Sequence, residues 1–289
     1  MDLIEGKTLA AEIRVQVKKE ITQTGLTPGL AVILVGDDPP SHTYVELKKE
    51  AAEEVGIRFT CHFFPVHANQ DEIMILIHEL NARMDIHAIL IQLPLPPHLD
   101  PNELIRAISS LKDADGFHPT NMQLLQKGAP RHLPVVARAA LALLKATHQS
   151  LQGKHAVLAV KSDIFSLSLS FMLSREGCKA ETVKLDDPHF KQKTTSADII
   201  ITAIGNAHYL TADYVKPGAT IIDIGTTVLP GGGTKGDADP VSLSAIPGFR
   251  SVVPGGIGPL TVAYLMQTTL ELAKIPFSSP LPKNVYIPY

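Results

Sequence analysis

Three short apolar runs, separated by amphipathic stretches, constrain the fold of the first half of this chain more than any other feature. The runs are rich in β-branched and aliphatic residues, which is typical of strands buried on both faces of a parallel sheet. The alternation of strand and helix predicts βαβ units with right-handed crossovers. We expect strands at residues 30–36, 57–64 and 88–93, and helices at residues 7–24, 41–55, 70–84 and 102–110.

A second series of the same kind follows a helix expected at Pro134–Lys145, which links two domains. Its apolar runs predict another parallel sheet of the Rossmann-like type, whose ligands bind beyond the carboxyl ends of the strands. The glycine-rich stretch at 229–236 lacks the Walker A spacing and is expected to form a flexible loop. We expect strands at 155–160, 181–185, 197–204 and 219–224, a last helix through Lys274, and an extended, packed tail from Ile275 to Tyr289.

The length of 289 residues is sufficient for two domains with sizeable cores. We expect an α/β fold in which two α/β domains surround a cleft and the second contains the Rossmann-like parallel sheet. The C-terminal segment is expected to pack back on the first domain. The first domain then comprises residues 1–135 with 262–289, and the second comprises residues 136–261.

Charge and composition exclude several classes of protein. The formal net charge of −3, without a basic stripe, gives no reason to expect nucleic-acid binding. No apolar run is long enough to span a bilayer, and the N-terminus lacks the pattern of a secretion signal. Cys61 and Cys178 lie far apart and outside any C-x-x-C pattern, so we expect no disulfide framework and no metal site. This cysteine usage fits a reducing compartment, and we expect a cytoplasmic protein.

The stretch from Ser41 to Lys48 holds residues suited to proton transfer. It follows the turn at 37–40, and Ser41 is expected to cap the helix that begins there. Tyr44 and Lys48 are four residues apart and therefore lie on one helix face. A lysine withdrawn from water beside a neutral partner can lose its charge near neutral pH and handle protons. Taken alone, the stretch favours the alternative, a solvated lysine beside a half-buried tyrosine on a surface helix.

Two further polar residues stand near the expected ends of strands or in a polar loop. Gln92 lies near the carboxyl end of the third expected strand, where ligands of parallel sheets bind. Asp115 lies in the loop at 112–121, which is dense in turn-forming residues. Each has an ordinary alternative. Gln92 alone is explained as an amide satisfied by backbone groups, and Asp115 alone as the side chain of an Asx-turn.

Four motifs, taken together and in order, carry a resemblance to a known family. They are Ser41-x-x-Tyr44-x-x-x-Lys48, Gln92-Leu93-Pro94-Leu95-Pro96, Lys112-Asp113-x-Asp115-Gly116-Phe117-His118-Pro119-x-Asn121 and Pro254-Gly255-Gly256-Ile257-Gly258-Pro259-x-Thr261. Weaker matches are Ala203-x-Gly205, Pro217-Gly218-Ala219, Ile222-Asp223-Ile224-Gly225 and Gly236-Asp237. With these residues, the chain resembles the bifunctional methylenetetrahydrofolate dehydrogenase/cyclohydrolase family, called FolD, nearly from end to end.

The resemblance implies two linked reactions. With NADP⁺, 5,10-methylenetetrahydrofolate is oxidised to 5,10-methenyltetrahydrofolate, which is then hydrolysed to 10-formyltetrahydrofolate. The resemblance further implies a role in one-carbon metabolism and purine biosynthesis, and a homodimer. It assigns the catalytic lysine to Lys48, its neutral partner to Gln92, the residue that stacks on the substrate to Tyr44, and the carboxylate that grips the pterin to Asp115. The implied substrate-binding residues are Tyr44, Gln92, Leu93, Pro94, Asp115, Gly255, Gly256 and Pro259.

The nucleotide-binding half departs from the family pattern. Val160 and Ser166 stand where the family has glycines that let the backbone approach a pyrophosphate. Asp186-Asp187 replaces a segment suited to the 2′-phosphate of NADP, and carboxylates at this position repel that phosphate. The stretch 134–137 departs from the family's Pro-Cys-Thr-Pro. We predict that the cofactor-binding residues are Val160, Lys161, Ser162, Asp186 and Thr226.

Three interpretations stay open. The chain is a full bifunctional enzyme with a rebuilt nucleotide loop, a cyclohydrolase with impaired hydride transfer, or a non-catalytic folate-binding protein. Lys48, Gln92 and Asp115 together argue against the third, because a protein that only binds folate does not need the lysine. The first is favoured over the second, because Lys161 and Ser162 still offer a cation and a hydroxyl to phosphate.

Overall fold

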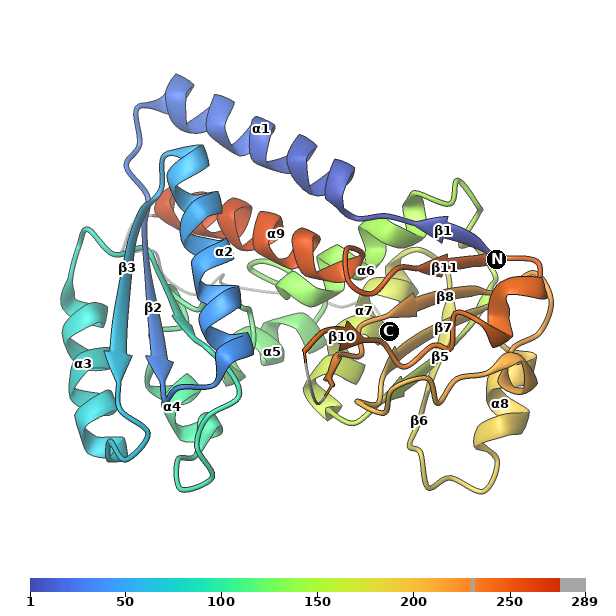
Figure 1. Ribbon diagram of the computed structural model, residues 1–289. Helices are drawn as coiled ribbons and strands as arrows, with labels where there is room; N and C mark the ends of the chain where they lie inside the picture. Colours follow the sequence, from blue (N-terminus) through green and yellow to red (C-terminus); the bar gives the residue numbers. More distant parts are fainter. Residues whose placement is uncertain (230–231, 276–289) are drawn as a thin grey trace. The chain divides into compact units, whose positions relative to one another are not determined.

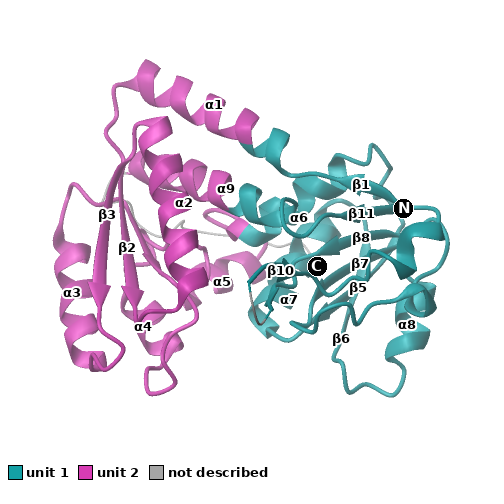
Figure 2. Ribbon diagram, viewed as in Figure 1, with its two compact units in different colours: residues 1–10, 136–261 teal, residues 11–135, 262–289 magenta. Residues whose placement is uncertain are grey.

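The computed structural model describes residues 1–229 and 232–275 (Figure 1). The chain forms two compact units (Figure 2). Unit 1 comprises Met1–Ala10 and Val136–Thr261, and unit 2 comprises Ala11–Val135 and the chain from Val262 onward. This division differs from the expected one in placing the first ten residues with unit 1. The expected extended tail falls almost entirely on residues 276–289, which lie outside the described residues.

Unit 2 is built on a three-stranded parallel sheet in the order β3-β2-β4. The strands are β2 (Gly29–Val35), β3 (Arg58–Phe64) and β4 (Ala88–Ile91). Every residue of the central strand β2 is buried, which explains why its sequence is a continuous apolar run rather than an alternating one. Sequence analysis therefore placed all three strands close to their observed bounds.

Helices cover both faces of this sheet and sort the side chains of β2 into two core clusters. Val32 and its neighbours on one face pack with α1 (Lys7–Thr24), α2 (Pro39–Val55) and the C-terminal part of α9 (Ile257–Ala273). The packing of α9 there agrees with the expectation that a C-terminal segment returns to the first domain. Ile33 and its neighbours on the other face pack with α3 and α4. The remaining helices of the unit are α3 (Gln70–Ala82), α4 (Pro101–Ala107) and α5 (Pro119–Gln126).

The start of α2 corrects one prediction. Asp38, rather than Ser41, is the N-cap, and its Oδ2 accepts hydrogen bonds from the backbone nitrogen of Ser41 at 3.0 Å and from its hydroxyl at 2.6 Å. The helix begins earlier because prolines are well suited to its first turn, where their missing N–H groups have no intrahelical partner. The other end was predicted correctly, since Gly56 terminates α2 with a left-handed φ of 88°.

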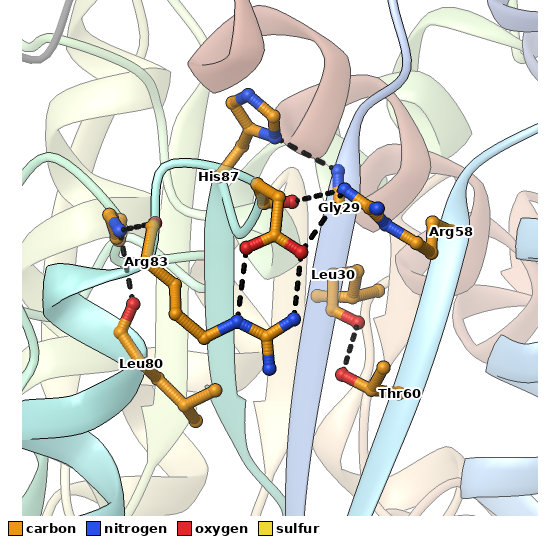
Figure 3. Close-up of polar contacts among 9 residues, drawn as sticks. Gly29, Leu30, Arg58, Thr60, Leu80, Arg83 and His87 are labelled. Atoms are coloured by element: carbon orange, nitrogen blue, oxygen red, sulfur yellow. Dashed lines mark hydrogen bonds and ion pairs between the residues drawn. The ribbon is translucent and has the colours of Figure 1, made fainter.

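Polar contacts fasten the amino-terminal end of the same sheet (Figure 3). Asp85 accepts two hydrogen bonds from Arg83, at 3.0 and 2.7 Å, and its carbonyl oxygen accepts one from Arg58 at 2.8 Å. Nδ1 of His87 accepts a hydrogen bond from the backbone of Gly29 at 3.0 Å. These groups join the beginnings of β2, β3 and β4, so the charged contacts shown in Figure 3 lie at the end of the strands opposite Gln92.

Unit 1 contains a six-stranded parallel sheet in the order β1-β11-β8-β7-β5-β6. The chain passes from β5 outward to β6 and then returns across β5 to β7. This reversal creates a switch point at which ligands of open α/β sheets bind. The strands are β1 (Asp2–Ile4), β5 (His155–Val160), β6 (Lys179–Val183), β7 (Ile199–Ala203), β8 (Thr220–Asp223) and β11 (Phe249–Ser251).

Short elements complete unit 1. The helices are α6 (Val135–Lys145), α7 (Asp163–Arg175) and α8 (Phe190–Ser196), with 3₁₀ turns at Ala212–Tyr214 and Ser242–Ala245. β9 (Thr227–Val228) and β10 (Thr234–Lys235) pair antiparallel in a separate hairpin. None of the helices in the described residues has the length and apolar character needed to cross a membrane.

Candidate active site

Helix α2 presents Tyr44 and Lys48 on one side, as their spacing predicts. The turn between them is anchored by Val45, which is buried in the core of unit 2. Both Tyr44 and Lys48 are half-buried, so neither is fully solvated. Nζ of Lys48 donates a 2.5 Å hydrogen bond to Oε1 of Gln92, which joins α2 to the end of β4. Lys48 is therefore not the fully solvated lysine of the alternative interpretation.

Gln92 is held on three sides. Its backbone nitrogen donates to the carbonyl of Ile33 at 2.9 Å and continues the pairing of β4 with β2. Its side-chain nitrogen donates to the carbonyl of Leu93 at 2.7 Å. This second contact turns the side-chain oxygen toward Lys48. The side-chain nitrogen of Gln92 is thus bound to a backbone carbonyl, and its side-chain oxygen is the neutral acceptor for Lys48.

Asp115 and Lys48 influence each other's protonation. Burial raises the pKa of Asp115 to about 6, the positive charge of Lys48 opposes this rise, and the negative charge of Asp113 adds to it. Burial lowers the pKa of Lys48, and the charge of Asp115 partly offsets that decrease. The direction of both shifts follows from the removal of charged groups from water. The structure thus brings together an amine, an amide and a carboxylate that sequence analysis had selected from three separate segments.

Lys112 fixes the loop that carries Asp115, a role that sequence analysis missed. Its side chain is only 2% exposed, and Nζ donates to the carbonyls of Leu80, Asn81 and Arg83 at 3.0, 2.8 and 2.6 Å. These carbonyls lie at the C-terminus of α3, where the backbone lacks intrahelical donors and a positive charge is favourable. The lysine is the first residue of the Lys-Asp-x-Asp motif, and its position within that motif was the available indication.

Asp113 holds the same loop from within. Its Oδ1 accepts from the backbone of Gly116 at 3.1 Å, and Oδ2 accepts from the backbone of His118 and the side chain of Asn121, both at 2.8 Å. Asp113 therefore makes the turn-stabilising contacts that the ordinary alternative assigned to Asp115. With Asp113 in that role, the carboxylate of Asp115 is available to a ligand.

Apolar residues border Asp115. A hollow beside it is lined by Ile89, Leu90, Ile91, Leu93, Ile105, Ile108, Asp113, Asp115 and Phe117. A second hollow is lined by Leu93, Pro94, Leu95, Pro96, Pro97, Leu99 and Pro101. Leu93 borders both hollows and is 45% exposed. An exposed apolar surface beside a small set of polar groups is suited to an aromatic ligand with a polar edge.

Unit 1 has a pocket at the predicted nucleotide position. It encloses about 660 Å³, its open side included, and lies at the carboxyl ends of β5, β6 and β7. It is lined by Ala159, Val160, Lys161, Lys184, Leu185, Asp186 and Ile204. The pocket therefore contains three of the five residues predicted to bind cofactor. Its two lysines and the switch-point position fit a ligand that carries phosphates.

Side chains brace the loop after β5, where the family that the chain resembles has glycines. Nζ of Lys184 donates to the carbonyl of Lys161 at 2.8 Å and to Asp163 at 2.6 Å. The hydroxyl of Ser162 caps α7 by accepting from the backbone of Phe165 at 3.3 Å. Ser166 forms a hydrogen bond with the hydroxyl of Thr182 on β6. Lys184 was not predicted, because its role depends on β6 lying beside β5.

The two carboxylates of the predicted acidic pair, Asp186 and Asp187, differ in their surroundings. Oδ2 of Asp187 accepts from Lys193 at 2.9 Å, and Oδ1 accepts from the backbone of His189 at 2.8 Å. The hydrogen bond from Lys193 is the main reason that the pKa of Asp187 lies below its usual range. Asp186 alone lines the pocket, where it is accompanied by Lys161 and Lys184. The lining thus carries more positive than negative charge.

The other predicted residues lie elsewhere in unit 1. Thr226 is exposed on the loop after β8 and is not among the residues that line the pocket. Gly255 precedes α9 with a φ of 107°, and its carbonyl accepts from the backbone of Gly6 at 2.9 Å. Gly256 and Pro259 complete this turn and the first turn of the helix. Residues 1–229 and 232–275 contain no cluster of His, Cys, Asp and Glu that could hold a metal ion.

Comparisons with known proteins agree with these features. The family profile described as "Tetrahydrofolate dehydrogenase/cyclohydrolase, catalytic domain" matches residues 4–115, and that described as its "NAD(P)-binding domain" matches residues 134–277. The bifunctional protein FolD of Geobacillus thermodenitrificans is 38% identical over 275 residues, which cover 94% of this chain and 97% of that protein.

Solved structures give the same result. The bifunctional FolD of Campylobacter jejuni is 37% identical, with a TM-score of 0.89 over 95% of this chain and 99% of that one. The FolD of Trypanosoma brucei, solved in complex with NADP cofactor and an inhibitor, is 30% identical. Its TM-score is 0.89, with coverage of 94% of this chain and 97% of that chain.

Proposed function

Because the chain belongs to the tetrahydrofolate dehydrogenase/cyclohydrolase family, we propose that Lys48, Gln92 and Asp115 form the folate half of its active site. The protein is a bifunctional enzyme of folate one-carbon metabolism. It oxidises 5,10-methylenetetrahydrofolate to 5,10-methenyltetrahydrofolate with NADP⁺ and hydrolyses the product to 10-formyltetrahydrofolate. The observation that carries the assignment of residues is the hydrogen bond from Lys48 to the neutral side chain of Gln92.

In the hydrolytic step, Lys48 is the proton-handling residue. Water adds to the cationic methenyl carbon and must lose a proton, which the neutral amine of Lys48 accepts. The resulting ammonium then returns a proton to the ring nitrogen as the carbon–nitrogen bond breaks. The hydroxyl of the adduct loses its remaining proton to solvent, which leaves the formyl group on the other nitrogen. Burial favours the neutral amine that this step needs, and an amide partner orients it without favouring its charged form as a carboxylate would.

Asp115 binds the substrate and assists this cycle. An ionised carboxylate accepts hydrogen bonds only, so it matches the paired N–H donors at the edge of a pterin ring. Its charge also helps Lys48 to accept a proton, because an opposite charge nearby favours the ammonium. Tyr44, on the same side of α2 as Lys48, and the apolar Leu93 and Pro94 offer surfaces on which the substrate's rings can stack.

The pocket in unit 1 binds the cofactor in this proposal. Lys161 and Lys184 would hold the phosphates, while Asp186 would accept from the 2′-hydroxyl of NAD⁺ but oppose the 2′-phosphate of NADP⁺. When bound, NADP⁺ supplies the nicotinamide that accepts the hydride from the methylene carbon. Gly255, Gly256, Pro259 and Thr226 are assigned to substrate or cofactor only through the family resemblance.

A second candidate is a cyclohydrolase with impaired hydride transfer. The buried Val160 and the presence of Ser166 favour it, because side chains replace two glycines beside the pyrophosphate position. Titration of the purified protein with NADP⁺, NAD⁺ and a folate analogue, with both activities assayed, separates the candidates. Folate binding with hydrolysis but no nucleotide binding would support the second candidate. Absence of folate binding would contradict both.

The proposal extends to the wider setting of the enzyme. We place it in the cytoplasm as a homodimer that supplies 10-formyltetrahydrofolate to purine biosynthesis. Support comes from the family resemblance and from Cys61 and Cys178, which are both free thiols. Sedimentation equilibrium measures the oligomeric state, and a monomer at micromolar concentration would contradict the dimer.

A further inference from the structure

Two motifs that the mechanism above does not use meet at the carboxyl edge of the sheet in unit 1. Asp223 is the last residue of β8, and Asp237 follows β10. Both carboxylates are buried, with exposed fractions of 1% and 0%. Together they form a carboxylate clasp, by which we mean these two side chains and the backbone segments that they bind.

Asp237 fastens the loop after β7. Its Oδ2 accepts from the hydroxyl of Thr202 at 2.8 Å and from the backbone nitrogen of Ile204 at 2.6 Å, and Oδ1 accepts from that of Asn206 at 2.9 Å. Ile204 is one of the residues that line the nucleotide pocket. One wall of that pocket is therefore held in place by Asp237, from a segment more than 30 residues away.

Asp223 fastens the segment that carries Asp237. Its Oδ1 accepts from the backbone nitrogens of Gly225 and Asp237 at 2.9 and 3.2 Å, and Oδ2 accepts from that of Ala238 at 2.8 Å. Gly225 leads directly to Thr226, which follows β8. The two carboxylates thus act in series: Asp223 holds the segment that carries Asp237, and Asp237 holds the loop after β7, which borders the nucleotide pocket.

The glycines of both motifs are explained by this arrangement. A Cβ atom on Gly225 would lie 2.2 Å from Cγ of Asp237, and one on Gly236 would lie 2.1 Å from Oδ2 of Asp223. Neither position leaves room for a side chain. Glycine is needed here for close packing against a carboxylate rather than for a left-handed backbone.

The contacts also require carboxylates rather than amides. All six hydrogen bonds described above come from N–H or O–H donors. An asparagine would present an NH₂ group to at least one of these donors and lose that contact. Burial, together with the charge of Asp237, raises the pKa of Asp223 to about 7. Burial of two neighbouring carboxylates costs free energy, and an arrangement of this kind marks a functional site more often than an ordinary turn.

We propose that Asp223 and Asp237 are positioning residues for nicotinamide nucleotide binding, which together hold the loop after β7 at the nucleotide pocket. This inference rests on the proposed function, because it concerns the cofactor of that function. It assigns no role to either residue at the folate half, which belongs to unit 2 and has its own anchors in Lys112 and Asp113.

The full-length variants Asp237→Asn and Asp223→Asn test the proposal, with Asp239→Asn as the matched control. Asp239 lies two residues away and accepts from the backbone of Val241 at 3.1 Å, outside the clasp. We expect the dissociation constant of NADP⁺, measured by calorimetry, to rise about tenfold or more in the two clasp variants, as the loss of a hydrogen bond to a charged acceptor predicts. Hydrolysis of methenyltetrahydrofolate without nucleotide should stay within about twofold of wild type, and the control should match wild type in both assays.

Amide hydrogen exchange supplies an independent readout. Asp237→Asn should accelerate exchange at Ile204 and Asn206 but not in β2. Unchanged NADP⁺ affinity in a folded Asp237→Asn variant would overturn the proposal. So would a parallel loss of hydrolysis, because it would show a general effect on folding. If the wild-type protein binds no nucleotide, the dehydrogenase part of the proposed function fails and the positioning role fails with it; faster exchange at Ile204 would then show a purely structural clasp.

Discussion

Lys48 on α2 donates a 2.5 Å hydrogen bond to the side-chain oxygen of Gln92 at the end of β4. The acceptor is neutral, and the nearby carboxylate of Asp115 interacts with the lysine through its charge. Gln92 therefore orients the amine of Lys48, and the charge of Asp115 partly offsets the decrease in the pKa of Lys48 that burial causes. In the proposed mechanism this arrangement lets Lys48 lose and regain a proton during hydrolysis. Each of the following predictions depends on one of these contacts or on the nucleotide pocket.

Replacing the neutral partner by a carboxylate should shift the pH dependence of hydrolysis. In Gln92→Glu a negative charge replaces the amide oxygen and raises the pKa of Lys48 from its lowered position. Because the neutral amine is the active form, cyclohydrolase activity at pH 7 should fall and recover partly as pH rises. Gln92→Met removes the acceptor without adding charge, so its profile should not move upward. A Gln92→Glu profile identical to wild type would refute the role of the amide.

Removal of the carboxylate of Asp115 should weaken folate binding. Hydrogen bonds to a charged acceptor are worth about 1.5–3 kcal/mol, so Asp115→Ala should raise the dissociation constant of a folate analogue about 10- to 100-fold. Both activities should fall, while NADP⁺ affinity should not change. Asp71→Ala, at an exposed position in the first turn of α3, is the control. Unchanged folate affinity in Asp115→Ala would leave this carboxylate without the proposed role.

Replacement of the buried Lys112, which anchors the loop that carries Asp115, should destabilise the protein. Lys112→Met keeps the aliphatic part of the side chain but leaves the carbonyls of Leu80, Asn81 and Arg83 without this donor. We expect the free energy of unfolding, measured with urea, to fall by about 2–4 kcal/mol, since unsatisfied buried groups cost about 1–3 kcal/mol each. Lys127→Met, on an exposed lysine, should change it by less than about 0.5 kcal/mol. Equal stability of the two variants would contradict this account of Lys112.

The two neighbouring acids of the nucleotide half should respond differently to substitution. Asp186 lines the pocket, so Asp186→Ser should raise NADP⁺ affinity by removing a repulsion of the 2′-phosphate. Asp187 is bound by Lys193 and faces its own turn, so Asp187→Ser should leave the affinity within about twofold of wild type. Calorimetric titration of both variants with NADP⁺ measures these affinities. A larger effect at Asp187 would show that this carboxylate, not Asp186, faces the cofactor.

The sequence was sufficient to locate the long elements and to select Lys48 and Gln92, which the structure brings together. The strands of unit 2 are continuous apolar runs because helices cover both faces, and that pattern is local. Lys48 and Gln92 were selected because a helix face and a strand end are each recognisable without tertiary information. Their meeting at 2.5 Å could be expected only from the resemblance to a family.

The missed features depend on partners that are distant in sequence. β1 and β11 are three residues each and exist because they pair with each other across the whole chain, so neither has a local pattern. α5 was not predicted, and its first three residues were included in the expected loop at 112–121 because turn-forming residues such as Pro119 are dense there. The hydrogen bond that Asp187 accepts depends on Lys193, which lies six residues later in α8. The anchoring role of Lys112 depends on α3, about 30 residues earlier.

The most direct test of the central claim is single-turnover hydrolysis of methenyltetrahydrofolate by Lys48→Met, measured beside the affinity of the same variant for a folate analogue. The proposal predicts a rate lower by roughly 100-fold or more, the usual effect of removing a positioned acid or base, with affinity within about threefold of wild type. Lys49→Met, on the adjacent exposed lysine, should hydrolyse at the wild-type rate. A Lys48→Met variant that binds the analogue and hydrolyses at the wild-type rate would show that the proton is handled by another group.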